Sequence, residues 1–173
     1  MTHPELQEWM SPYFWEELEL IIRTCIQLVM AYIGTVSFSV LFSVPPKHYF
    51  HCGITGVVGW AVYLFISTEF KTPIVATFFA SAVLTMYARR LAVKCKATTT
   101  VFLLCGIFTL VPGAGIYYTA ANFFTGDGQA ALLSGMDTIK TAVAIGLGIG
   151  VAYSVPARWF GWKKKAEVWQ ENN

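Results

Sequence analysis

Charged residues are scarce in this chain of 173 residues. Asp, Glu, Lys and Arg make up 13% of it, against about 25% in ordinary soluble domains. The formal net charge is only +2, and the basic residues form no stripe, which excludes a nucleic-acid partner. The motifs HExxH, GxSxG and a Walker-type phosphate loop are all missing. We therefore expect neither an enzyme nor a bound cofactor.

The cysteines also lack a recognisable pattern. There are four, at positions 25, 52, 95 and 105, with no CxxC pair and no Cys/His spacing typical of a metal site. All lie in or beside apolar stretches, so we expect neither a disulfide framework nor a zinc site. His48 and His51 lie near a predicted loop, and we interpret them as interfacial residues.

Hydrophobic residues are abundant, at 55% of the chain, and the mean hydropathy is +0.54. They gather in long runs, and a membrane-spanning helix needs about 20 such residues. Barrel strands would alternate strictly, which these runs do not. A soluble bundle would need polar outer helix faces, which the stretches 102–108 and 143–155 lack. The sequence predicts an all-α integral membrane protein, a bundle of five transmembrane helices within 24–46, 52–68, 72–88, 97–126 and 128–157.

The two ends of the chain differ from this core. Residues 1–19 mix acidic and aromatic side chains, which predicts a short N-terminal interfacial helix or, alternatively, the frayed start of the first span. Residues 20–158 form the transmembrane domain and residues 159–173 a basic cytoplasmic tail. Basic residues predominate on one side, which predicts a cytoplasmic C-terminus and an external N-terminus in the bacterial inner membrane. That side carries Lys47, Arg89, Arg90, Lys94, Lys96, Arg158 and the lysines at 163–165, whereas the other carries Arg23 and Lys71.

The fourth run is too long for one straight span. Its length as a helix would be about 45 Å, against a hydrocarbon core of about 30 Å. Pro112 lacks an N–H group and clashes with the carbonyl of residue 108, while Gly113 and Gly115 permit unusual backbone angles. These residues predict a broken fourth helix whose second half begins near Ala114 with free N–H groups. A simple proline kink is the alternative.

Candidate functional residues gather around this break and in the fifth span. Asp137 and Lys140 are three residues apart on one helix face and are able to pair. Lys140 lies at a depth similar to that of the break and either binds an anion there or extends outward to the interface. Arg89 and Arg90 either anchor the third span or form a cytoplasmic gate. Gly146 and Gly150 have the spacing of a close helix contact.

The predicted substrate site combines the break with the residues that follow it and the lysine of the fifth span. We predict substrate binding by Pro112, Gly113, Gly115, Tyr117, Tyr118, Asn122 and Lys140, with Asp137 as the proton-coupling candidate.

Several motifs together resemble the threonine/serine exporter family, and in particular its short C-terminal half, which many bacteria encode as a separate small subunit. They are ARRL at 88–91, VF at 101–102, LVPGAGIY at 110–117 and AIGLGIG at 144–150. The resemblance covers about residues 50–155. Three threonines stand where the family usually has a proline, between the basic pair and the VF motif.

The resemblance implies secondary-active, proton-driven export of small polar carboxylates, either threonine and serine or a dicarboxylate. It also implies a larger membrane subunit as partner, with a homo-oligomer as a further possibility. The alternative is a structural or assembly subunit that transports nothing itself, since the glycine spacings and short loops suit that role equally well.

Overall fold

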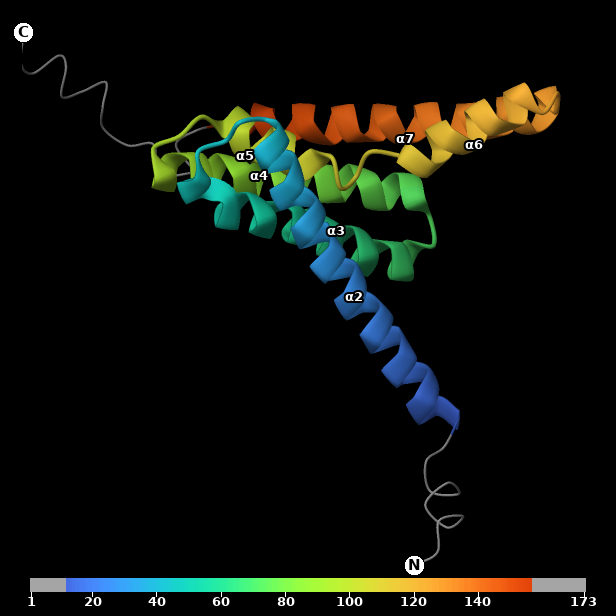
Figure 1. Cartoon of the computed structure of the whole chain (residues 1–173), viewed down its shortest axis with the longest axis horizontal. Coiled ribbons are helices and arrows are strands. Elements are labelled where there is room, and N and C mark those ends of the chain that lie inside the picture. Colours follow the sequence, from blue (N-terminus) through green and yellow to red (C-terminus); the bar gives the residue numbers. More distant parts are fainter. Residues whose placement is uncertain (1–11, 157–173) are drawn as a thin grey trace, which may run out of the picture.

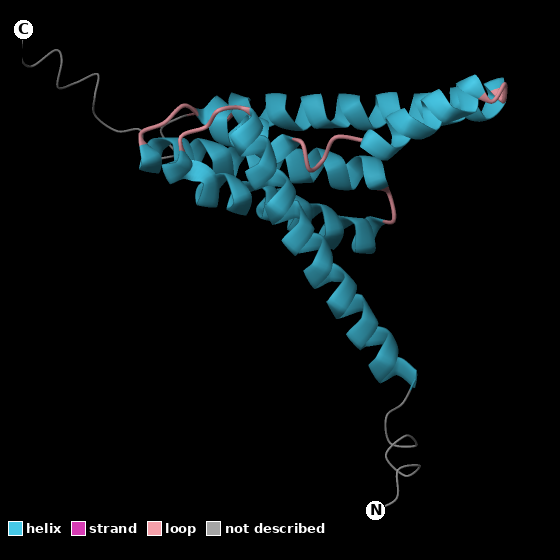
Figure 2. Cartoon of the chain, in the orientation of Figure 1, coloured by secondary structure: helices cyan, strands magenta, loops and turns pink. Residues whose placement is uncertain are grey.

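The computed structural model describes residues 12–156, and within that range all regular secondary structure is helical (Figures 1 and 2). Long helices run back and forth, and short turns connect them. In chain order the elements are α2 (Pro12–Leu41), the 3₁₀ helix η1 (Pro46–His48), α3 (Tyr49–Phe70), α4 (Pro73–Cys95), α5 (Thr99–Ile107), α6 (Gly113–Phe124) and α7 (Gly128–Ser154). The all-α prediction is confirmed for these residues.

Four of the helical segments are long and apolar enough to cross a membrane: Glu17–Leu41, Pro46–Phe70, Pro73–Cys95 and Gly128–Ser154. They contain most of the first, second, third and fifth predicted runs. The fourth run differs because it is divided between α5 and α6, and each is too short to span a bilayer alone. The structure thus shows four long candidate spans where the sequence predicted five spanning helices.

The beginning of α2 corrects one prediction. The described part of the predicted interfacial segment, from Pro12, continues directly into the first span and forms no separate helix. Proline is well tolerated in the first helical turn, and no glycine or further proline interrupts the chain before Gly34. Residues 1–11, and the basic tail at 159–173, lie outside the described residues.

Small and hydroxyl-bearing residues hold the helices close together. α3 packs against α2, α4 and α5, and α7 packs along α4. A side chain at Gly56 of α3 would meet the Thr35 hydroxyl of α2, and one at Gly59 would meet Leu84 of α4. Buried hydroxyls such as those of Ser39 and Thr85 donate to carbonyls of their own helices. These hydroxyls therefore keep a hydrogen-bond partner although the helices pack closely around them.

The glycines of α7 act differently from the prediction. Gly146 and Gly150, with the expected spacing, face open space, and an added Cβ would meet nothing within 4 Å. Gly148, between them, lies directly against Ser81 and the backbone of α4. Within the described residues, Gly148 is therefore the glycine of α7 that lies in close contact with α4. Helix periodicity alone does not identify which face of α7 meets α4.

Candidate functional site

The break in the fourth predicted span is real in the structure. α5 ends at Ile107, and α6 begins at Gly113, one residue before the predicted position. Between them two tight-turn hydrogen bonds close the chain, from the Thr109 amide to the Gly106 carbonyl (3.2 Å) and from the Leu110 amide to the Ile107 carbonyl (2.9 Å). Because Pro112 has no N–H to continue the helix, the chain unwinds here instead of merely bending. Figure 2 shows this stretch as a loop in the middle of the molecule.

The two halves of the broken segment pack on different neighbours. α5 lies against α2, α3 and α4, whereas the extensive contacts of α6 are with α7. The loop between them is anchored, since the Phe108 ring stacks on Phe38 with centroids 4.4 Å apart and Leu110 is only 6% exposed. The break thus moves the chain from the helical core onto α7 while remaining fixed itself.

α6 and α7 meet through two reciprocal contacts of small residues. A Cβ on Gly115 of α6 would meet the Thr138 hydroxyl of α7, and a Cβ on Gly135 of α7 would lie 3.3 Å from Thr119 of α6. The Thr119 hydroxyl donates to the Gly115 carbonyl at 2.7 Å. This close approach brings the start of α6 directly against the middle of α7.

A cleft of about 220 Å³ lies at that point. Among the predicted substrate residues, Pro112, Gly115 and Tyr118 line it, together with Asp137, the predicted proton-coupling residue. Gly113, Tyr117, Asn122 and Lys140 do not line it. Its remaining walls are Ser134, Thr138 and Thr141, all from α7.

Asp137 and Lys140 form the predicted pair. Lys140 Nζ donates to Asp137 Oδ1 at 3.0 Å, and the side chains are 53% and 74% exposed respectively. The pair places opposite charges beside the cleft, on a helix with the length and composition of a membrane span. Ionisable groups at such positions are typical of substrate or ion pathways.

The backbone at the start of α6 leaves donors available. Within the described residues, the amides of Ala114 and Gly115 donate to no carbonyl or side chain. The first-turn amides of a helix carry a partial positive charge. Gly115, in the first turn of α6, lines the cleft. The free amides of this turn are hydrogen-bond donors of the kind that bind carboxylates.

Sequence reasoning missed the three hydroxyl residues of the cleft. Ser134, Thr138 and Thr141 share one face of α7 with Asp137. Thr138 and Thr141 donate to the carbonyls of Ser134 (2.7 Å) and Asp137 (2.9 Å), so their oxygens keep lone pairs for a ligand. The signal was present as polar residues that recur at helical spacing within an apolar helix.

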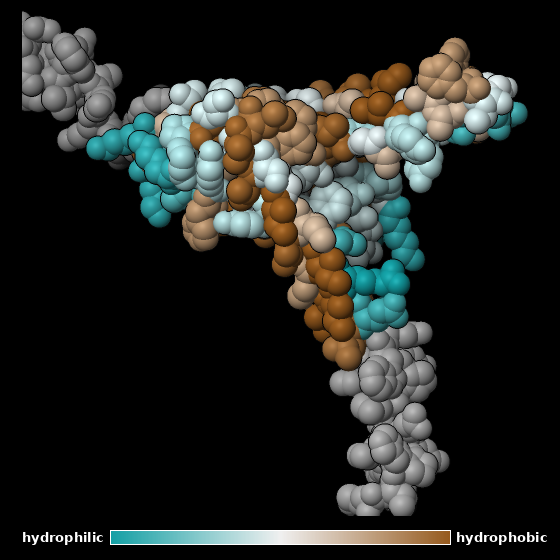
Figure 3. Space-filling model, viewed as in Figure 1, coloured by the Kyte–Doolittle hydropathy of each residue, from teal (hydrophilic) through white to brown (hydrophobic). Residues whose placement is uncertain are grey.

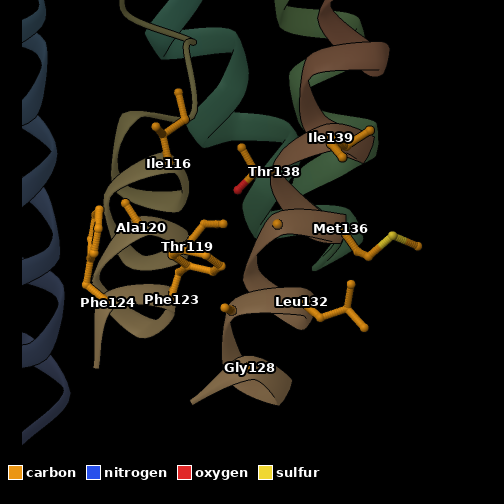
Figure 4. A pocket seen from close by; sticks show the side chains of 12 residues that line it. Ile116, Thr119, Ala120, Phe123, Phe124, Gly128, Leu132, Met136, Thr138 and Ile139 are labelled. Carbon is orange, nitrogen blue, oxygen red and sulfur yellow. The ribbon is translucent and has the colours of Figure 1, made fainter. Parts of the chain in front are cut away.

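A larger groove of about 730 Å³ lies between α6 and α7 towards their connecting turn (Figure 4). Its lining is almost entirely apolar, with Ile116, Phe123, Leu132 and Ile139 among its residues. Figure 3 shows further hydrophobic surface along α2. These surfaces suit lipid or another protein, not a polar solute.

The two arginines of α4 lie at the end of the bundle where α7 finishes. Arg89 Nη1 donates to the carbonyls of Ala152 (2.6 Å) and Val155 (2.9 Å), and its guanidinium lies 5.4 Å from the centre of the Tyr153 ring. Arg90 is exposed. The structure thus shows Arg89 in a capping contact at the end of α7.

These features define a class: an all-helical protein with four candidate membrane spans and an interrupted helix beside a charged pair. The chain belongs to the threonine/serine exporter family, since the family model described as "Threonine/Serine exporter, ThrE" matches residues 27–155. The family is one of exporters and not of enzymes.

The chain is also similar to an uncharacterised protein. An uncharacterised protein of Haemophilus influenzae is 29% identical over 98 residues, which cover 56% of this chain and 33% of that protein. The chain thus matches only about a third of that relative's length. No solved structure matches the chain.

Proposed function

We propose that this chain is one subunit of a secondary-active, proton-driven exporter of small polar carboxylates, with its substrate site at the cleft between the start of α6 and the middle of α7. The observation that carries the proposal is the meeting of Pro112, Gly115 and Tyr118 with Asp137 in that cleft. An interrupted helix that faces an ionisable residue is a recurrent arrangement for solute binding in transporters.

The charges beside the cleft fit a zwitterion. The amides at the start of α6 suit a carboxylate, while the Asp137 carboxylate suits an ammonium group and is held in place by Lys140, 3.0 Å away. This combination favours threonine or serine over a dicarboxylate, which has no cationic group for Asp137.

The same carboxylate supplies a route to coupling. Asp137 accepts either a proton or the substrate ammonium, because protonation removes the negative charge that attracts the cation. If the Asp137 carboxylate binds a proton or the solute but never both at once, the protein is able to exchange one for the other across the membrane. On this basis proton entry drives solute exit.

We further propose that α5 and α6 together make the fourth of five crossings, with the C-terminus cytoplasmic and the N-terminus outside. Five basic residues lie near the start of α3 or the end of α4, which are adjacent in the bundle, as the positive-inside tendency requires: Lys47, Arg89, Arg90, Lys94 and Lys96. The bacterial inner membrane is the corresponding location.

A larger membrane subunit of the same family is the proposed partner. The apolar groove between α6 and α7 and the exposed face of α2 give it a surface, with Phe124, 85% exposed, as the most prominent side chain. A second copy of this chain is the other candidate occupant.

Transport by reconstituted protein tests the proposal. We expect a pH gradient to drive efflux of labelled threonine or serine from proteoliposomes that contain this chain and its partner. Asp137→Asn should abolish that efflux. Asp127→Asn is the matched control, because Asp127 only caps α7 through the Ala130 amide (3.0 Å) and asparagine caps equally well. Efflux that survives Asp137→Asn would remove Asp137 from the mechanism.

The second candidate function is assembly without transport. The apolar groove favours it, since that groove offers a large docking surface with few polar groups for a solute. In this case the partner alone would transport, and every cleft variant of this chain would leave efflux unchanged as long as the complex assembled.

A further inference from the structure

Three side chains of metal-binding type meet at the end of the bundle where α3 begins and α4 ends. His48 is the last residue of η1, His51 lies in the first turn of α3, and Cys95 is the last residue of α4. α3 and α4 are successive helices joined by a short turn and packed side by side, so the start of one adjoins the end of the other. One ligand atom of each side chain lies within 4.8 Å of the other two.

The two histidines are held in place as ligands are. His48 is 8% exposed, and its ring stands edge-on to Phe102 with centroids 5.6 Å apart. Nδ1 of His51 is buried and has no hydrogen-bond partner within the described residues. A buried polar atom without a partner is unfavourable unless something else satisfies it, and a bound cation does so.

We propose that His48, His51 and Cys95 bind one Zn²⁺ ion. Nitrogen and sulfur donors are the ligands that zinc prefers, and three protein ligands leave the fourth tetrahedral position to water. The bond lengths of such a site set ligand atoms about 3.3–3.8 Å apart. The ligand atoms now lie within 4.8 Å of one another, so they need to approach by at most about 1.5 Å to reach these distances. Rotation of the side chains supplies this movement.

The surrounding charges permit a cation at this point. Lys47, Lys94 and Lys96 are neighbours in sequence, but all three are exposed, so solvent and salt screen them. Zinc binding deprotonates the Cys95 thiol, and the resulting thiolate offsets part of the ion's charge. The ion would join α3 to α4 at one end of the core cluster that includes Phe102 and Cys105.

Cobalt substitution gives a direct test on the full chain, purified without a polyhistidine tag and with His3→Ala as background, since His3 lies outside the described residues. We expect Co²⁺ at one equivalent per chain to produce a thiolate-to-metal charge-transfer band that Zn²⁺ removes. Cys95→Ser should lose the band, and Cys25→Ser, at an exposed cysteine of α2, should keep it. His51→Gln should weaken Co²⁺ binding by more than the roughly 10–100-fold that loss of an outer partner causes.

A second measurement needs no substitution at the site. Zn²⁺ should slow maleimide labelling of Cys95 in the same protein while it leaves labelling of Cys25 unchanged. Equal labelling with and without Zn²⁺, or a charge-transfer band that persists in Cys95→Ser, overturns the proposal. A site that binds water or a lipid headgroup instead would give that result.

Discussion

The Arg89 guanidinium on α4 donates from Nη1 to the backbone carbonyl of Ala152 on α7, 2.6 Å away. The last carbonyls of a helix have no partners within the helix and carry a partial negative charge. A cation from a neighbouring helix therefore caps α7 and links the C-terminal ends of two parallel helices. The sequence suggested the pair Arg89 and Arg90 as an anchor or a gate. Arg89 thus has a contact that joins α4 to α7.

Replacement of Arg89 should loosen this contact. Arg89→Gln is expected to lower the free energy of unfolding by about 1–2 kcal/mol, since a charge-assisted bond to a carbonyl is lost. Thermal unfolding in detergent measures the effect. Lys94→Gln, an exposed basic residue later on the same helix, should change stability by much less, and an equal loss in both variants would contradict the capping role.

The glycines of α7 give a second matched pair. Gly148→Ala should destabilise the protein, because the new methyl group would meet Ser81 and the backbone of α4. Gly146→Ala should be neutral or stabilising by about 0.5–1 kcal/mol, since the space there is open and alanine favours the helix. Unfolding midpoints of the two variants, compared with the unsubstituted chain, decide between these outcomes.

Lys140→Met removes the cation that pairs with Asp137. We expect transport to slow strongly while the complex still assembles, because the exposed pair contributes little to stability and the Lys140 ammonium holds the Asp137 carboxylate in position beside the cleft. Labelled efflux and co-purification with the partner are the two measurements, with Lys94→Met as control. Normal efflux in Lys140→Met would exclude a role for Lys140.

Pro112→Ala tests the break itself. Alanine restores the missing N–H and favours a continuous helix, so we expect α6 to shift relative to α7 and transport to slow by about tenfold or more. A decrease in efflux without loss of folded protein is the expected result. Full activity would mean that the break serves packing alone.

The break was predictable because it is a local property. The residues that cause it, Pro112 and the glycines after it, are adjacent in sequence, and their effects on the backbone are intrinsic. The pairing of Asp137 with Lys140 was predictable for the same reason, since three residues along a helix set their distance.

Features that depend on contacts between helices were not predictable in this way. Periodicity did not show that Gly148, instead of Gly146 and Gly150, meets α4. Nor did spacing along the chain bring Cys95 to His48 and His51, because their proximity depends on how α3 and α4 pack. Lys140 was expected in the cleft, but the rotation of α7 places Ser134, Thr138 and Thr141 there.

The separate attachments of α5 and α6 have a mechanical consequence. α5 is bound to the core by three helices, while α6 is attached extensively to α7 alone. Because α7 is itself packed along α4, a partner that contacts the hairpin near its turn would move α6 relative to α7, with the stretch from Phe108 to Pro112 as the pivot. Such a movement would widen or narrow the cleft between Gly115 and Asp137 while α7 stays in place.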